Sequence, residues 1–400
     1  MIRGVLAAAL ALSALPAAAQ MDPSKRLQLE GGFERGVGAP GPVAPYAYLY
    51  MNHPGVFGSS TTLRLALAPV YVDSELGLTE AMPRTDVGLG ISGGGYAFGQ
   101  TEVYRGTDLR GESFMGHGGG PSLSFYPRLG KVGPVPINGV VRVGAAYANY
   151  ERDSKTDAAF QLPPDEWTGF ARFGIRAGGS PPGLNPGPAG EVSAWLERRD
   201  REHGGVYGIN GDREARRRSH LYWTRGFVSL PLKNGSLVAG GFSLGDGDGV
   251  DRFSAYRLGG MLTMNAEFPL IIPGYFSHEI AATSYAHVWA REGVPLDEQH
   301  RYVWSVFAAG AGVKPVRGTD PGGTYHGGVG VALGFMPKRA ALRGEFSYGY
   351  SPTALRGRRR GGHGVALTME LNFNAPGLPS RARLPSTQEG LRWLLGPFNP

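Results

Sequence analysis

The sequence predicts an all-β protein, a transmembrane antiparallel β-barrel of about sixteen strands, and three observations support this prediction. Segments of about ten residues alternate apolar and polar side chains with a period of two, as the lipid-facing and lumen-facing residues of such barrels do. Glycine supplies 65 of the 400 residues, about twice the ~7% of ordinary chains. No apolar run approaches the ~20 residues that a transmembrane helix needs.

The first residues predict a cleaved secretory signal peptide, with the mature chain starting near Gln20. Arg3 gives a positive start, the run from Val5 to Leu15 is apolar, and Ala17 to Ala19 are small residues suited to cleavage. We therefore expect residues 1-19 to be the signal peptide, 20-373 the barrel and 374-400 a C-terminal periplasmic tail. The expected location is the bacterial outer membrane.

The alternation is clearest from Gly364 to Phe373. One face carries Val365, Leu367, Met369 and Leu371, and the other carries Ala366, Thr368, Glu370 and Asn372. The first face suits lipid and the second suits water. A soluble β-sandwich or propeller would also alternate, but a dry core does not accommodate the arginines and glutamates that recur on the polar faces.

Clusters of Gly, Pro and Asn divide the chain into segments with strand character. These segments are 26-34, 44-53, 61-72, 86-95, 98-106, 119-128, 137-151, 166-178, 189-201, 218-231, 236-245, 249-258, 276-292, 301-313, 323-336, 340-351 and 363-373. Because bacterial barrels have an even number of strands, we assign 249-258 to a long external loop. Sixteen strands then remain, with the short links in the periplasm and the longer loops, including 73-85 and 246-275, outside.

Composition excludes several classes of function. The chain has no cysteine, so it forms neither disulfides nor thiolate metal sites. Its net charge of +7 is spread along the chain or gathered in glycine-rich loops, which argues against a nucleic-acid partner. We expect the charges to line the lumen and to meet outer-membrane lipid and the phosphates of lipopolysaccharide. The arginine clusters suited to these phosphates are Arg213, Arg216, Arg217 and Arg218, and Arg356, Arg358, Arg359 and Arg360.

No arrangement of residues indicates an enzyme. His220 and His287 lie on predicted strands with serines nearby, but neither a Gly-x-Ser-x-Gly elbow nor a consistent triad order is present. Asp246, Asp248 and Asp251 offer spaced oxygen ligands, yet the bidentate glutamate of a calcium loop is missing. We therefore expect no catalytic residues, no cofactor and no metal.

Charged residues on the polar faces are the candidate lumen residues. They are Arg64, Arg142, Arg172, Arg176, Arg225, Glu279, Arg343, Glu345 and Glu370. In an open lumen the arginines would favour anionic solutes, as in a passive porin-like channel. In a plugged lumen we expect them to be paired with an inner loop.

One loop carries a short motif. Tyr256 to Gly260 reads Tyr-Arg-Leu-Gly-Gly, and Pro273, Gly274 and Tyr275 follow after an apolar run. This pattern resembles the sixth external loop of the BamA and FhaC type of assembly and secretion barrels (the bacterial surface antigen barrel domain), where a Gly-Gly pair precedes an Arg-Gly-aromatic tip that folds into the lumen. Five predicted strands follow the loop, as in that family.

The resemblance implies a role in insertion or transport of protein or lipid, with insertion of this barrel by the barrel assembly machinery. Two features differ from the family. Pro273 stands where the tip arginine is usual, so Arg257 is the candidate to pair with Glu279, Glu345 or Glu370. Few residues separate the signal peptide from the first strand, so we expect the family's periplasmic receptor domains to be replaced by a separate periplasmic partner protein. An ordinary glycine-containing hairpin at Gly259, Gly260 and Gly274 is the alternative interpretation of the loop.

Overall fold

The structure is a computed structural model that describes residues 21-38, 40-95, 97-133, 135-179, 189-262, 268-335 and 341-375. The predicted signal peptide and most of the predicted C-terminal tail lie outside these ranges, so both stay predictions. No helix in the described ranges combines the length and the apolar character that a membrane crossing requires.

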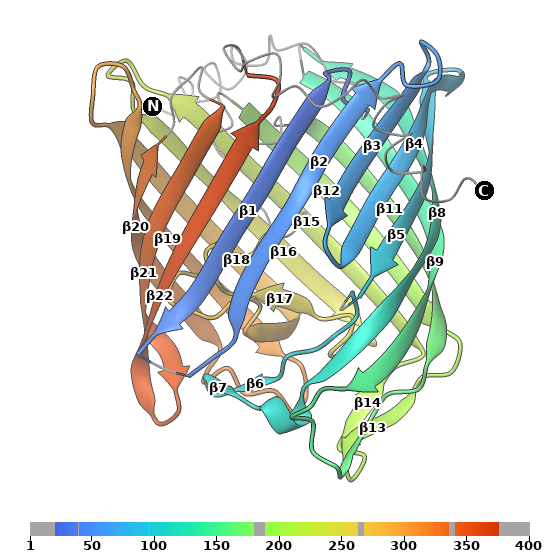
Figure 1. The fold of residues 1–400 in the computed structure, drawn as a ribbon, viewed down its shortest axis with the longest axis vertical. Coiled ribbons are helices and arrows are strands. Elements are labelled where there is room, and N and C mark those ends of the chain that lie inside the picture. Colours follow the sequence, from blue (N-terminus) through green and yellow to red (C-terminus); the bar gives the residue numbers. More distant parts are fainter. Residues whose placement is uncertain are drawn as a thin grey trace, which may run out of the picture.

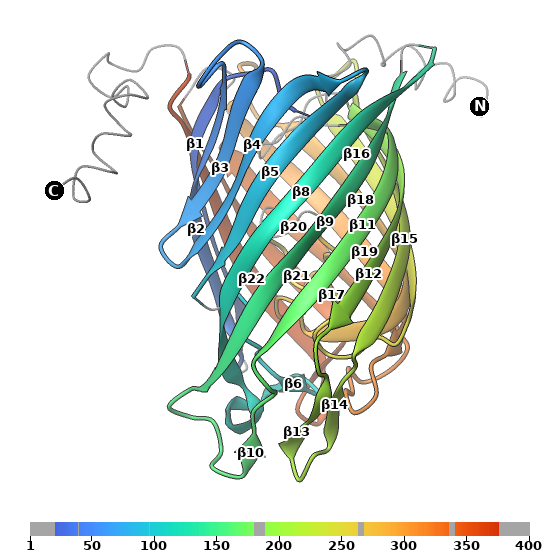
Figure 2. The same cartoon turned by 90° about the vertical axis from the view of Figure 1, so that its right-hand side faces the viewer.

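A closed antiparallel β-barrel forms the body of the molecule (Figures 1 and 2). Its strands are β1 (Arg26–Val37), β2 (Val43–Pro54), β3 (Thr61–Ala68), β4 (Tyr71–Met82), β5 (Thr85–Gly94), β8 (Phe114–Val132), β9 (Val135–Arg152), β11 (Glu166–Gly179), β12 (Ala189–Arg201), β15 (Arg218–Pro231), β16 (Leu237–Asp248), β18 (Ile280–Pro295), β19 (Tyr302–Pro315), β20 (Tyr325–Phe335), β21 (Leu342–Arg356) and β22 (Arg359–Asn372). Each pairs with its sequence neighbours, and β1 pairs with β22 from Gln28↔Asn372 to Val37↔His363. This last ladder closes the ring and confirms the predicted sixteen-stranded barrel.

The remaining short elements lie in the connections that follow β5, β9, β12 and β16. Except for β17, they lie at the lower end of the barrel in Figures 1 and 2. They are β6 (Val103–Tyr104), β7 (Thr107–Asp108), the 3-10 turn η1 (Arg110–Glu112), β10 (Phe160–Gln161), β13 (Gly205–Ile209), β14 (Arg213–Ala215) and β17 (Tyr256–Leu258). β17 adds to the sheet by pairing with β18. The long connections gather at this end, which is the predicted external side.

The two faces of the wall differ in polarity, as the alternation predicts. On β22, Thr368 and Glu370 are buried inside the barrel, while Leu367 and Met369 point outward with 42% and 45% of their surface exposed. Leu367 lies opposite Phe33 on β1 and Phe346 on β21, which are also exposed. An exposed apolar face is favourable only in contact with lipid, so these strands form a transmembrane wall.

Two of the predicted strands were placed wrongly. The predicted segment 61-72 is two strands, because the chain turns at Pro69 and Val70 between β3 and β4. β4 therefore occupies most of the predicted external loop 73-85, while the predicted strand 98-106 belongs to a connection and contains only β6. The two errors cancel, so the strand number is right. Asp73 and Glu75 gave β4 the composition of a loop, but both pair with arginines of other strands.

We expect Leu367→Arg to lower the free energy of unfolding by about 2-4 kcal/mol if Leu367 lies near the bilayer midplane, because its side chain faces lipid. Leu367→Met, which keeps the apolar contact, is the matched control. Urea titration of the protein in lipid vesicles measures both. Equal stability of the two variants would show that this face does not meet lipid.

Candidate functional site: the connection between β16 and β18

The longest connection in the barrel joins β16 to β18 and is the one that carries the predicted loop motif. Its described residues are 249-262 and 268-279. β17, which forms part of it, is seen within the outline of the barrel in Figure 1. We call residues 259-262 and 268-279 of this connection the inner loop, because the contacts described below are with side chains on the polar face of the wall.

Glu34 of β1 holds the first part of the inner loop. Its carboxylate accepts hydrogen bonds from the backbone N–H groups of Met261 (2.6 Å) and Leu262 (3.1 Å). Gly260 adopts a φ of +81°, and a Cβ atom there would lie 2.6 Å from the Glu34 Oε1 atom. Only glycine fits both requirements without strain. Glu34 is almost fully buried, and both hydrogen bonds reach its Oε2 atom, while Oε1 has no hydrogen-bond partner among the described residues.

Phe268 holds the inner loop on the other side of the barrel. Its ring centroid lies 5.3 Å from that of Trp195 on β12 and 5.7 Å from that of Trp223 on β15. The Arg225 guanidinium lies 5.0 Å from the Phe268 centroid, within the range of a cation–π contact. If β1 is counted as the first strand of the ring, β12 is the ninth strand and β15 is the tenth. The contacts of the inner loop therefore involve opposite sides of the barrel.

The tip of the inner loop, at Pro273 to Tyr275, packs against β20 and β21. The Tyr275 hydroxyl is 2.8 Å from His326 Nδ1 and 3.1 Å from the Thr353 hydroxyl. Gly274 has a φ of +83°, and a Cβ atom there would lie 2.4 Å from the backbone nitrogen of Ser351. The predicted motif glycine is thus a position of close approach between the loop and the wall.

Arg356, at the end of β21, is the main charged anchor. It donates to Glu279 Oε1 (2.9 Å) and to the carbonyl oxygen of Gly274 (2.7 Å). Its guanidinium also lies over the ring of Phe276, 3.9 Å from the centroid. The Arg356–Glu279 pair is buried. Arg356 of the wall thus binds the loop, whereas the sequence predicts that Arg257 of the loop binds the wall.

The predicted partners of Arg257 were wrong. Arg257 donates to the carbonyl oxygen of Arg252, 2.7 Å away. The three candidate carboxylates each bind a different arginine: Glu279 pairs with Arg356, Glu345 with Arg291 and Glu370 with Arg343. The sequence offered no way to distinguish Arg356 from its neighbours in a basic segment that we had assigned to phosphate binding.

The other predicted lumen arginines also pair with carboxylates of the wall. The nitrogen–oxygen distances are 3.1 Å for Arg64–Asp73, 3.1 Å for Arg142–Glu75, 2.5 Å for Arg172–Glu197, 3.4 Å for Arg176–Glu191, 3.5 Å for Arg225–Glu191 and 3.7 Å for Arg343–Glu370. These partners lie on barrel strands, and Arg225 also contacts the inner loop through the ring of Phe268. Pairing of the arginines with the inner loop stays a prediction. Paired charges largely cancel, which weakens the positive field expected for an anion channel.

The connections on the predicted external side contact one another across the mouth of the barrel. Arg252 binds Glu102, and Arg213 binds Glu112, so three connections meet there. Burial lowers the pKa of Arg213 to about 10. Asp251, which we had considered as a calcium ligand, accepts hydrogen bonds from Arg201 and from the backbone N–H of Arg216.

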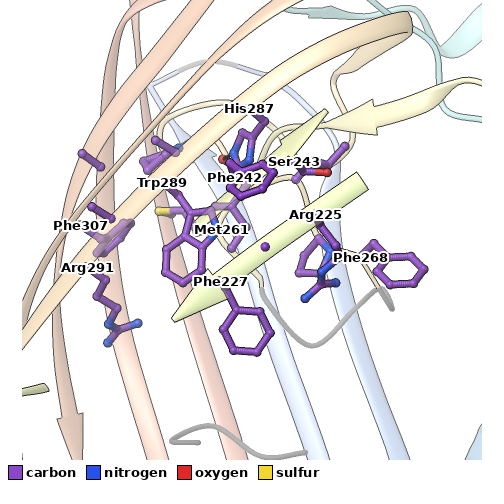
Figure 3. Close-up of a pocket in the computed structure, with 18 of the residues that line it drawn as sticks. Arg225, Phe227, Phe242, Ser243, Met261, Phe268, His287, Trp289, Arg291 and Phe307 are labelled. Atoms are coloured by element: carbon purple, nitrogen blue, oxygen red, sulfur yellow. Dashed lines mark hydrogen bonds between the residues drawn. The ribbon is translucent and has the colours of Figure 1, made fainter. Parts of the chain in front are cut away.

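A cavity of about 170 Å³ remains between the inner loop and the wall (Figure 3). Phe227, Trp289 and Phe307 line it from the strands, and Met261 and Phe268 line it from the loop. His287, predicted as a strand residue, is at its edge and hydrogen-bonds through Nε2 to the Ile271 carbonyl oxygen at 2.8 Å.

Neither a protein-family model nor a curated protein matches the sequence. Among solved structures, CdiB from Acinetobacter baumannii matches with a TM-score of 0.59 and 10% identity over 90% of this chain and 64% of CdiB. BamA from Haemophilus ducreyi lacking POTRA domains 1-3 matches with a TM-score of 0.54 and 11% identity over 89% of this chain and 74% of BamA.

CdiB from Escherichia coli matches with a TM-score of 0.55 and 13% identity over 88% of this chain and 63% of that protein. The chain thus spans less than two thirds of either CdiB. These similarities show that the chain has the sixteen-stranded barrel fold of BamA and CdiB, as the sequence resemblance predicts.

We expect Arg356→Met to release the tip of the inner loop, because it removes the partner of a buried carboxylate, a change that costs about 3-5 kcal/mol in other proteins. Chymotrypsin should then cut at Tyr275 and Phe276, which are buried in the intact protein. Arg358→Met, which changes an exposed arginine two residues away, is the control. Resistance of both variants would rule out Arg356 as the anchor.

Proposed function

We propose that this protein acts in insertion or transport of protein or lipid at the outer membrane, with the inner loop as a releasable plug of the lumen. The observation that carries the proposal is that the loop contacts opposite sides of the wall through a few localised anchors. These are the Glu34 carboxylate, the Phe268 ring and the Arg356–Glu279 pair.

The fold supports this proposal. CdiB and BamA share it, and in this chain the connection with the resembling motif contacts the wall at Glu34, Phe268 and Arg356. The proposal includes a periplasmic partner protein that delivers the client, contact of the outer rim with lipopolysaccharide, and insertion by the barrel assembly machinery. It includes no catalytic step.

The anion-selective porin is the second function that the sequence allowed. Its basis was the set of lumen arginines. Because each of them has a wall carboxylate within 4 Å, the set offers less attraction to anions than the sequence suggested. We therefore rank the porin function below insertion or transport of protein or lipid.

Single-channel conductance in a planar bilayer tests the plug. We expect the intact protein to conduct weakly and intermittently, and deletion of Met261 to Tyr275 to give a large, steady current, because the deletion removes the segment that contacts opposite sides of the wall. Deletion of the external β13–β14 hairpin, which leaves the inner loop in place, is the control. A large, steady, anion-selective current from the intact protein would instead establish the porin.

Reconstitution tests the transport role. Vesicles that contain the protein should take up a urea-unfolded outer-membrane β-barrel faster than empty vesicles, as measured by the appearance of protease-protected client. Separately, labelled lipid should cross the bilayer faster than in empty vesicles if lipid is the cargo. Rates equal to those of empty vesicles in both assays, with and without periplasmic extract, would contradict the proposed function.

A further inference from the structure

The wall has a break in its backbone hydrogen bonding between β2 and β5. β3 pairs with β2 only from Leu49↔Leu67 to Pro54↔Thr62. Among the described residues, 43-48 of β2 therefore have a strand partner only on the β1 side. Figure 1 shows the β3–β4 hairpin ending well above the lower rim, while β2 and β8 continue past it.

The free edge borders lipid. Outward-facing Val43 is 46% exposed, and Pro45 lies opposite Phe33, which is also exposed on the outer face. Proline occurs in sheets almost solely on edges, because it cannot donate a ladder hydrogen bond. Val70, at the tip of the β3–β4 hairpin, is 50% exposed. Unpaired backbone groups are tolerated at membrane depth only where protein, water or another polar partner meets them.

An apolar cluster connects this edge to the cavity of Figure 3. Ala44 and Tyr46, on the inner face of β2, pack against a cluster formed by Met261 and Leu262 of the inner loop and Ala366 of β22. Met261 belongs at the same time to the lining of the cavity, together with Phe307 of the same cluster. Methionine has a flexible side chain that adapts to different neighbours. Met261 is therefore suited either to separate the cavity from the β2 edge or to let the two join.

The lining of the cavity defines the chemistry of a ligand. Its walls are mostly aromatic and aliphatic, and its volume of about 170 Å³ is close to that of an engineered apolar cavity of ~150 Å³ that binds benzene. The charged groups at its margin, Arg225 and Arg291, already pair with Glu191 and Glu345. The cavity therefore suits the end of an uncharged hydrocarbon chain.

We propose that the cavity binds the acyl chain of an outer-membrane amphiphile, which reaches it from the lipid through the break beside β2. The two parts of such a molecule match the two parts of the site. Oxygen atoms of its head group can accept hydrogen bonds from free N–H groups of the β2 edge, and its chain fills the apolar cavity. This inference concerns a binding site and is independent of the proposed transport of protein or lipid.

Quenching of tryptophan fluorescence by brominated acyl chains tests the site, since Trp289 lines the cavity from inside the barrel. The refolded full-length chain is placed in phosphatidylcholine vesicles with dibrominated chains and compared with unbrominated vesicles. We expect Trp289→Phe to reduce the quenched signal, although Trp289 lies on the polar face of the wall. Trp304→Phe removes a tryptophan exposed on the outer face of β19, and it measures for comparison the quenching of a side chain in direct contact with lipid.

Filling the cavity gives a second measurement that keeps Trp289. Ala309→Leu adds atoms to a residue of the lining, directly opposite Trp289, and should abolish most of the Trp289 quenching. Ala286→Leu, on the outward face of the neighbouring strand, is the control. If Trp289→Phe or Ala309→Leu leaves quenching unaltered, no acyl chain occupies the cavity and the proposal is overturned.

The route is tested by blocking the break. The chain has no cysteine, so Val70→Cys creates a unique site for a bulky, positively charged thiol reagent at the hairpin tip. Modification there should reduce Trp289 quenching, whereas modification of Val206→Cys, an exposed position on β13, should not. Unchanged quenching after complete labelling at position 70 would contradict the proposed route.

Discussion

Closure of the strand ring between β1 and β22 is the constraint on which the rest of the structure depends. In hydrocarbon each backbone N–H and C=O needs a partner, and a sheet meets this requirement only when its first and last strands pair. The ladder from Gln28↔Asn372 to Val37↔His363 supplies these partners. Closure also fixes which residues point inward, so the polar side chains of the alternation line an enclosed space where each charge needs a counter-charge.

The wall meets that need within itself. Arg172 binds Glu197 of the adjacent strand, and Arg343 binds Glu370 in the same manner. These ion pairs join neighbouring strands, so the wall supplies counter-charges for its own inward-facing arginines. In its described residues the inner loop is held at Glu34, Phe268 and Arg356. These anchors are the physical basis of the proposed plug.

The break beside β2 is a place where the requirement for paired backbone groups is not met by a neighbouring strand. The short β3–β4 hairpin leaves part of one edge without a strand partner, and Pro45 reduces the number of donors there. On the inner face of this edge, side chains of β2 pack against the apolar cluster around Met261. Wall and inner loop are therefore linked at one place where lipid, lumen and cavity come close together.

The sequence by itself determined the class of fold, because a period of two in segments of about ten residues depends only on which side chains face lipid. It located the inner loop through Gly260 and Gly274, whose backbone angles favour glycine. It could not separate β3 from β4, because Asp73 and Glu75 look like loop residues until their arginine partners are known. Nor could it single out Arg356, Glu34 or the cavity, since tertiary structure alone brings together residues such as Glu34 and Met261 that lie far apart in the chain.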